Sequence, residues 1–208
     1  MAGADAAKPA DVLVVFGITG DLAKVMTFRS LYRLERRGLL QCPIVGVAVS
    51  DWTVEQLREH ARECIVGTGE TVDDEVFARF AARLSYVSGD FTDAATYERL
   101  GQTIASVVGG ADGPSDAGAK RAAGAGDAAG AGGAANSPVF YLEIPPSLFG
   151  PVVGQLAGAG LVGAGGRVVV EKPFGHDLAS AMALADELHQ YIDESQLYRI
   201  DHYLGKMG

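Results

Sequence analysis

The strongest constraint on the fold is the alternation of short apolar runs with longer amphipathic stretches. Runs typical of β-strands occupy 12–16, 44–49, 86–87, 139–142, 168–170 and 197–200. Helical patterns occupy 21–37, 53–66, 73–84, 93–107, 147–161 and 177–194. Strands that alternate with helices are joined by right-handed crossovers and form a mainly parallel sheet. The pattern predicts an α/β chain with a doubly wound, Rossmann-type domain.

Local signals mark several helix ends. The 21–37 stretch is amphipathic, and Gly38 is a typical stop signal. Its apolar positions are Leu22, Met26, Leu31 and Leu34. Thr53 and Gln56 have the spacing of a capping box, and Asp177 is suited to cap the helix that follows it.

One segment departs from this pattern. Residues 109–135 contain nine glycines and eleven alanines, and no apolar side chain larger than alanine. Such a segment cannot bury enough area to offset the entropy lost on ordering. An Ala-rich helix is the alternative, which the glycines disfavour. We expect a flexible surface insertion over 109–136 within one dinucleotide-binding domain spanning 1–208.

Composition excludes several classes of function. A net charge of -9 and a pI near 4.8 argue against nonspecific nucleic-acid binding, because phosphates would meet a negative surface. The apolar runs are far shorter than the roughly 20 residues of a membrane helix, so we expect no membrane partner. Two cysteines, Cys42 and Cys64, are too few for a disulfide scaffold. We expect reduced thiols and a cytoplasmic protein, and we assign no metal ligands.

The turn after the first apolar run suits phosphate binding. It consists of Gly17, Ile18, Thr19, Gly20, Asp21, Leu22, Ala23 and Lys24. Gly17 allows a tight strand-to-helix turn, Gly20 lets the backbone approach a pyrophosphate, and Ala23 permits close packing. The N–H groups of the helix that begins here can bind an anion.

The motif is not a strict G-x-G-x-x-G, because Thr19 and Leu22 replace two of its glycines. A plain turn is therefore an alternative, but the position after the first strand of an alternating chain favours a nucleotide site. Asp21 would compete with a phosphate, so we interpret it as the cap of its own helix.

Four segments in order resemble the glucose-6-phosphate dehydrogenase family. They are the 17–24 turn, Phe140-Tyr141-Leu142-Glu143-Ile144-Pro145-Pro146, Glu171-Lys172-Pro173-Phe174-Gly175, and Tyr198-Arg199-Ile200-Asp201-His202-Tyr203-Leu204-Gly205-Lys206. The resemblance covers nearly the whole chain except the Gly/Ala-rich insertion. It implies an oxidoreductase of the pentose phosphate pathway. Such an enzyme oxidises glucose 6-phosphate at C1 to 6-phosphogluconolactone and passes the hydride to NADP.

The resemblance also implies roles for particular residues. His202, Tyr203 and Lys206 would hold the sugar phosphate, a dianion that favours such donors. Lys172 would lie between the sugar and the nicotinamide, contacting both substrate and cofactor. A cis peptide before Pro173 would hold Lys172 in place.

The sequence departs from the family in three ways. The family usually continues beyond Lys206 into a large second domain that carries the general base and the usual subunit interface. We therefore expect no catalytic base in this chain, a missing homo-oligomer interface, and a truncation. Val49 stands where the family commonly has an arginine for the 2′-phosphate of NADP, and Asp51 lies nearby, so NAD is also possible. Phe149 stands where many members have a cofactor-side tyrosine.

Two hypotheses of different classes follow. The first is the nucleotide domain of a glucose-6-phosphate dehydrogenase. The second is a truncated, noncatalytic remnant that binds a dinucleotide or only folds. The general base of the second domain distinguishes them, because proton removal from the C1 hydroxyl must accompany hydride departure.

Overall fold

The computed structural model describes residues 8–109, 135–175 and 177–200. Within these ranges six strands form one sheet, and all neighbouring strands are parallel. The strands are β1 (Val12–Phe16), β2 (Ile44–Ala48), β3 (Leu84–Ser88), β4 (Pro138–Leu142), β5 (Arg167–Glu171) and β6 (Leu197–Ile200). Their order is β3-β2-β1-β4-β5-β6, so the direction of winding reverses between β1 and β4. The predicted doubly wound α/β fold is confirmed.

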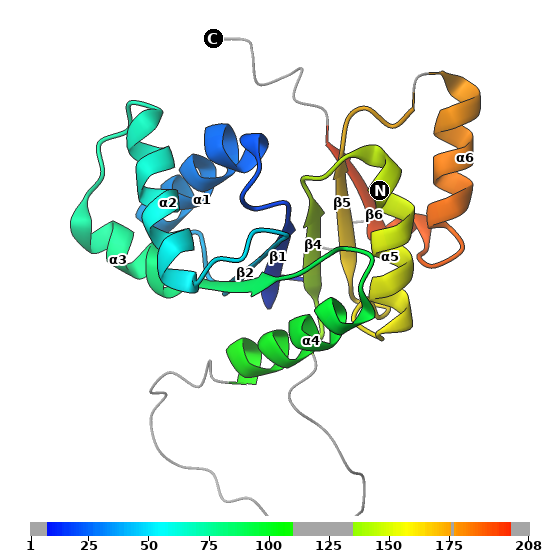
Figure 1. Ribbon diagram of the computed structural model, residues 1–208, viewed down its shortest axis with the longest axis horizontal. Helices are drawn as coiled ribbons and strands as arrows, with labels where there is room; N and C mark the ends of the chain where they lie inside the picture. Colours follow the sequence, from blue (N-terminus) through cyan, green and yellow to red (C-terminus); the bar gives the residue numbers. More distant parts are fainter. Residues whose placement is uncertain (1–7, 110–134, 176, 201–208) are drawn as a thin grey trace, which may run out of the picture.

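Helices cover the two faces of the sheet (Figure 1). On one side lie the π-helix η1 (Ala23–Thr27), α1 (Phe28–Arg36), α2 (Val54–Gly67) and α3 (Asp74–Ala82). On the other lie α4 (Ala94–Gly109), α5 (Phe149–Gly158) and α6 (Leu178–Leu188). Two short 3₁₀ turns, η2 (Pro146–Leu148) and η3 (Glu194–Gln196), precede α5 and β6.

The central strands separate two hydrophobic clusters. Val15 on β1 packs with Phe28 and Leu57 on the α1 and α2 side. Val14 packs with Leu100 and Val152 on the α4 and α5 side. Because both faces of β1 and β2 are covered, these strands are continuous apolar runs rather than alternating ones.

The start of the first helical segment differs from expectation. Phe28 N–H donates to the carbonyl of Ala23, five residues earlier, so the chain makes a π turn before α1 begins. Leu31 is buried as expected, but Met26 and Leu34 are 40% and 36% exposed. The buried positions of η1 and α1 are Ala23, Thr27, Phe28, Leu31, Tyr32 and Glu35. The wider turn changes the face that η1 presents to the sheet, so the stripe predicted from the apolar residues was partly wrong.

The buried carboxylate in this stripe is paired. Glu35 is 4% exposed and accepts from Arg83 Nε at 2.6 Å and Arg79 Nε at 3.4 Å. The ion pairs join α1 to α3, because Arg79 lies within α3 and Arg83 is the residue that caps its carboxyl end. Two guanidinium partners make the burial of this charge tolerable.

Several predicted helix ends are confirmed. Thr53 and Gln56 form a reciprocal capping box at α2. Asp177 accepts from Ser180 N–H at 2.8 Å and caps α6. The last helix ends at Leu188 rather than near 194, because the chain turns there and η3 leads into β6. Gly38, with φ of 67°, follows α1.

Other expectations concern the chain as a whole. The predicted flexible insertion lies almost entirely outside the described residues. Cys42 and Cys64 are buried free thiols, as expected of reduced cysteines. Among the residues that the structure describes, no helix has the length and apolar character needed to cross a bilayer.

Candidate functional site

The turn from Gly17 to Lys24 lies at the carboxyl end of β1, beside the point where the strand order reverses. Gly17 N–H donates to the Val47 carbonyl of β2 at 2.8 Å, and Gly20 N–H donates to the Gly17 carbonyl at 2.8 Å. These bonds fold the turn tightly against the sheet edge. In open α/β sheets, ligands bind in the crevice at this reversal point.

Gly17 allows the chain after β4 to approach the turn. Its φ is 81°, in the left-handed region that favours glycine. A Cβ at this position would overlap the carbonyl oxygen of Glu143. Glu143 N–H also donates to the Phe16 carbonyl at 3.0 Å, which holds the two segments together. The glycine is therefore required by both conformation and space.

Ile18 anchors the turn in the core. Its side chain is fully buried over β2, where Gly46 leaves room for it. A Cβ at Gly46 would lie 2.7 Å from Ile18 Cγ2. The turn is thus held by packing on its inner side, while Gly20 and Asp21 are exposed.

A polar contact joins the turn to the end of β2. Thr19 Oγ1 and Ser50 Oγ lie 3.2 Å apart, and Tyr86 of β3 donates from its hydroxyl to the Ser50 carbonyl at 2.6 Å. Burial, and then the charge of Asp51, raises the pKa of Tyr86 to about 12. The tyrosine therefore remains a neutral donor, and it fixes the segment that follows β2. Val49 in that segment is 66% exposed.

Two carboxylates, the half-buried Glu143 and the buried Glu171, lie at the ends of β4 and β5. Thr27 of η1 donates to Glu143, and the Tyr141 hydroxyl donates to Glu171. Burial, followed by the hydrogen bond to Glu171, raises the pKa of Tyr141 far above its usual range. These hydrogen bonds connect η1 to the chain after β4, and β4 to the carboxyl end of β5. Sequence reasoning did not identify them, although charged residues directly after apolar strands were a usable signal.

Lys172 immediately follows Glu171 and is exposed. The peptide bond between Lys172 and Pro173 is cis, as the family resemblance implied. The sequence-predicted turn and Lys172 therefore both lie at carboxyl ends of strands, on β1 and β5 respectively.

The other predicted site residues have different outcomes. His202, Tyr203 and Lys206 lie outside the described residues. Leu22, the residue before η1, makes no side-chain capping bond. Asp21 is exposed, and the helix-capping role expected of it stays a prediction. Phe149 is 1% exposed and packs in the core with α4 and α5 residues, so its ring belongs to the hydrophobic cluster.

The residues present fit a dinucleotide. The tight glycine turn, the helix that begins behind it and the strand reversal are the three parts of a pyrophosphate cradle. The fold and the site together define a Rossmann-type dinucleotide-binding domain.

The particular family follows from the sequence as a whole. Residues 14–116 and 121–207 match the family described as "Glucose-6-phosphate dehydrogenase, NAD binding domain". The chain belongs to this family.

Known relatives agree with this assignment. A glucose-6-phosphate 1-dehydrogenase 1 of Mycobacterium tuberculosis is 48% identical over 196 residues, which are 94% of this chain and 36% of the relative. That of Bacillus subtilis is 33% identical over 203 residues, again 36% of its length. This chain therefore spans about a third of the relatives that it matches.

Solved structures give the same result. A glucose-6-phosphate 1-dehydrogenase from Mycobacterium avium is 49% identical, with a TM-score of 0.78 over 95% of this chain and 38% of that one. A glucose-6-phosphate dehydrogenase in complex with its substrate glucose-6-phosphate is 33% identical, with a TM-score of 0.77 over 96% of this chain and 38% of that one.

Proposed function

We propose that this chain supplies the dinucleotide-binding part of a glucose-6-phosphate dehydrogenase. The observation that carries the proposal is the Gly17–Lys24 turn, held against Glu143 and Val47 at the strand reversal. The activity proposed for the whole enzyme is oxidation of glucose 6-phosphate at C1, in the cytoplasm, with hydride transfer to a nicotinamide dinucleotide.

The chain's own residues would bind and orient the reactants. Backbone N–H groups at the start of the helix after Gly20 have no partners within that helix, so they can hold the pyrophosphate. When bound, the nicotinamide supplies the hydride acceptor. Lys172 would donate from its ammonium to a sugar hydroxyl and hold the sugar beside the cofactor. The cluster of Tyr141 and Glu171 would support the strand end that carries Lys172.

The cofactor that we propose is NADP, the family's usual one, with NAD as a second possibility. Val49 is exposed at the position where a charged partner for the 2′-phosphate would stand, and a valine cannot pair with a phosphate. Asp51 is exposed close by, and a carboxylate there suits a free ribose hydroxyl. Val49 and Asp51 therefore support a site that prefers NADP over NAD only weakly.

A noncatalytic dinucleotide-binding unit is the second candidate. Of the imidazoles that the structure describes, His60 packs between Phe28 and Trp52, and His189 bonds Glu194 at 2.8 Å. Neither contact involves the Gly17–Lys24 turn or Lys172. A base for the C1 hydroxyl is therefore not supplied by these two residues, which favours binding without turnover.

Calorimetric titration of the 208-residue chain with NADP and NAD tests the proposal. Gly20→Val should weaken dinucleotide binding at least tenfold, because a side chain at this exposed turn would block the approach of the pyrophosphate. Gly158→Val is the control for the change to valine, since a Cβ there meets nothing within 4 Å, whereas a Cβ at Gly20 would lie 3.0 Å from the Gly17 carbonyl oxygen. No saturable binding of either dinucleotide, or equal losses in both variants, would contradict the proposed site. Formation of NADPH on adding glucose 6-phosphate distinguishes the catalytic from the noncatalytic candidate.

A further inference from the structure

A cavity of about 500 Å³ lies between the η1–α1 segment and α2, and it meets the glycine turn only at Lys24. Its lining includes Lys24, Val25, Arg29, His60, Glu63 and Cys64. Neither Gly17 nor Gly20 lines it. Lys24 connects the two places, because its N–H donates to the Gly20 carbonyl at 3.1 Å. The volume is within the usual range for small-molecule sites, about 300–1,000 Å³.

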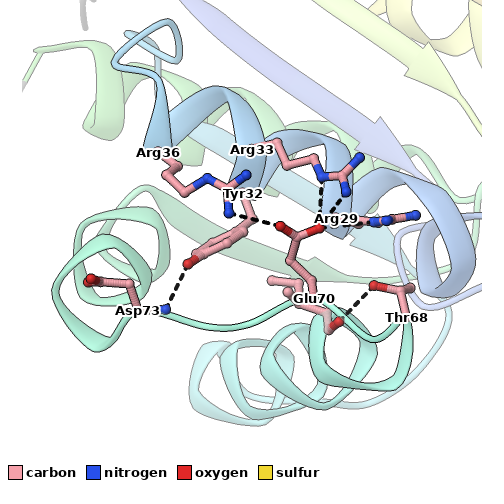
Figure 2. A network of polar contacts seen from close by, with 8 residues as sticks. Arg29, Tyr32, Arg33, Arg36, Thr68, Glu70 and Asp73 are labelled. Carbon is pink, nitrogen blue, oxygen red and sulfur yellow. Dashed lines mark hydrogen bonds and ion pairs between the residues drawn. The ribbon is translucent and has the colours of Figure 1, made fainter.

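Helix α1 carries three arginines, of which Arg29 lines the cavity. Arg29, Arg33 and Arg36 converge on the Glu70 carboxylate, with N–O distances of 3.2, 2.6 and 2.8 Å (Figure 2). Hydrogen bonds from Arg33 and then Arg29 are the main favourable causes that hold the pKa of Glu70 at about 2. Three guanidinium groups thus share one carboxylate, and positive charge remains in excess beside the cavity. In a chain of net charge -9 this concentration is unusual.

Arg29 lies at the boundary between the arginine cluster and the cavity. It meets Glu70 through Nε, and a guanidinium carries five N–H donors in a planar fork. Its side chain is 37% exposed. Lys24 adds a second cation, and Glu63 is the carboxylate on the opposite wall. The donors present match a phosphate better than a single carboxylate, because a guanidinium and an ammonium can divide the charge of a dianion.

The α2 wall carries two hydrogen-bonding side chains, His60 and Cys64, beside Glu63. The His60 ring makes edge contacts with Phe28 and Trp52, at centroid distances of 5.9 and 5.0 Å. Burial lowers the pKa of His60, so the imidazole is neutral near pH 7. Cys64 Sγ lies 3.4 Å from His60 Nε2. Val25, 59% exposed, adds an apolar contact surface on the other wall.

The backbone of η1 gives an independent indication. The π turn places Lys24 and Val25 on the cavity while Ala23 and Thr27 are buried. Single π turns inside helices are uncommon, and they occur frequently at functional sites. Here the π turn overlaps the end of the glycine turn and supplies Lys24 and Val25 to the cavity.

We propose that this cavity is a binding site for a small phosphate monoester, beside the cofactor site and sharing Lys24 with it. The phosphate would contact Lys24 and Arg29, and the organic part would lie against Val25 and His60. Occupation of the site stabilises the π turn, and through Lys24 it acts on the segment that begins at Gly20.

Inorganic phosphate is the probe for the test. Trp52 is the only tryptophan of the chain, it contacts His60, and it lines a smaller cavity that shares His60 and Glu63. Its fluorescence should change saturably with phosphate, compared with chloride at equal ionic strength. In a Cys42→Ser background, phosphate should also slow alkylation of Cys64. Neither readout requires a dinucleotide. The phosphate site can therefore be tested even if the chain is found not to bind NADP or NAD.

A matched pair of variants locates the binding. Arg29→Gln and Arg33→Gln each remove one cation that contacts Glu70, but only Arg29 of this pair lines the cavity. We expect Arg29→Gln to weaken phosphate binding at least tenfold and Arg33→Gln to weaken it less than threefold. Equal losses would show a general charge effect and overturn the proposal. Displacement of phosphate by NADP would assign it to the cofactor turn, and a fluorescence response that does not saturate, or that chloride reproduces, would also overturn it.

Discussion

The carbonyl oxygen of Glu143 occupies the space beside Gly17 that any larger residue's Cβ would need. Two segments far apart in the chain therefore meet across the strand reversal at a single glycine. The contact sets how closely β1 and the chain after β4 approach, and so it shapes the floor of the candidate dinucleotide site.

Replacing this glycine should damage both stability and binding. Gly17→Ala must adopt a left-handed conformation, which costs about 1–2 kcal/mol, and it must also displace Glu143. Gly38→Ala is the control, because Gly38 has φ of 67° but a Cβ there would meet nothing within 4 Å. In urea denaturation we expect Gly17→Ala to lose clearly more stability than Gly38→Ala. Equal losses would show that the Glu143 contact can relax.

Cofactor preference should respond to Val49. Val49→Arg places a cation where the 2′-phosphate of NADP would lie, and a charged hydrogen bond contributes about 1.5–3 kcal/mol. We expect NADP affinity to rise roughly tenfold or more while NAD affinity changes little. Calorimetric titration of both dinucleotides measures the ratio. An unchanged ratio would show that the 2′-phosphate lies elsewhere.

The buried pair of Glu35 and Arg83 should contribute strongly to stability. Arg83→Ala leaves a carboxylate that is 4% exposed with the more distant Arg79 as its partner, so we expect a loss of about 3 kcal/mol. Arg79→Ala removes a partner that is 55% exposed, and about 1 kcal/mol or less should be lost. Urea denaturation of both variants measures the two losses of stability. A larger loss for Arg79→Ala than for Arg83→Ala would contradict the prediction.

Stability should fall in acid through Glu70. Its folded pKa of about 2 lies below the ordinary value of 4.5. Its contribution is therefore fully present above pH 4.5 and is lost as the pH falls toward 2. Glu70→Gln should reduce the slope of stability against pH in this window, whereas Glu98→Gln on the exposed side of α4 should not. Equal slopes in Glu70→Gln and the unaltered chain would contradict this.

The sequence was sufficient for the architecture because its signals are local. Continuous apolar runs define strands buried on both faces, and the capping residues Thr53 and Asp177 act on N–H groups three residues away. The glycine turn could be located for the same reason, since strand, turn and helix are consecutive.

Only the tertiary structure decided which distant side chains meet. Glu143 beside Gly17, Ser50 beside Thr19 and Glu70 among the α1 arginines are contacts between separate segments. Glu35, a charged residue, is buried because α3 brings Arg79 and Arg83 to it. Such contacts depend on the order of the strands and on the rotation of each helix about its axis. A single π turn, such as the one in η1, changes that rotation. The sequence by itself determined the dinucleotide-binding fold and its turn, and packing between segments determined the shape and charge around them.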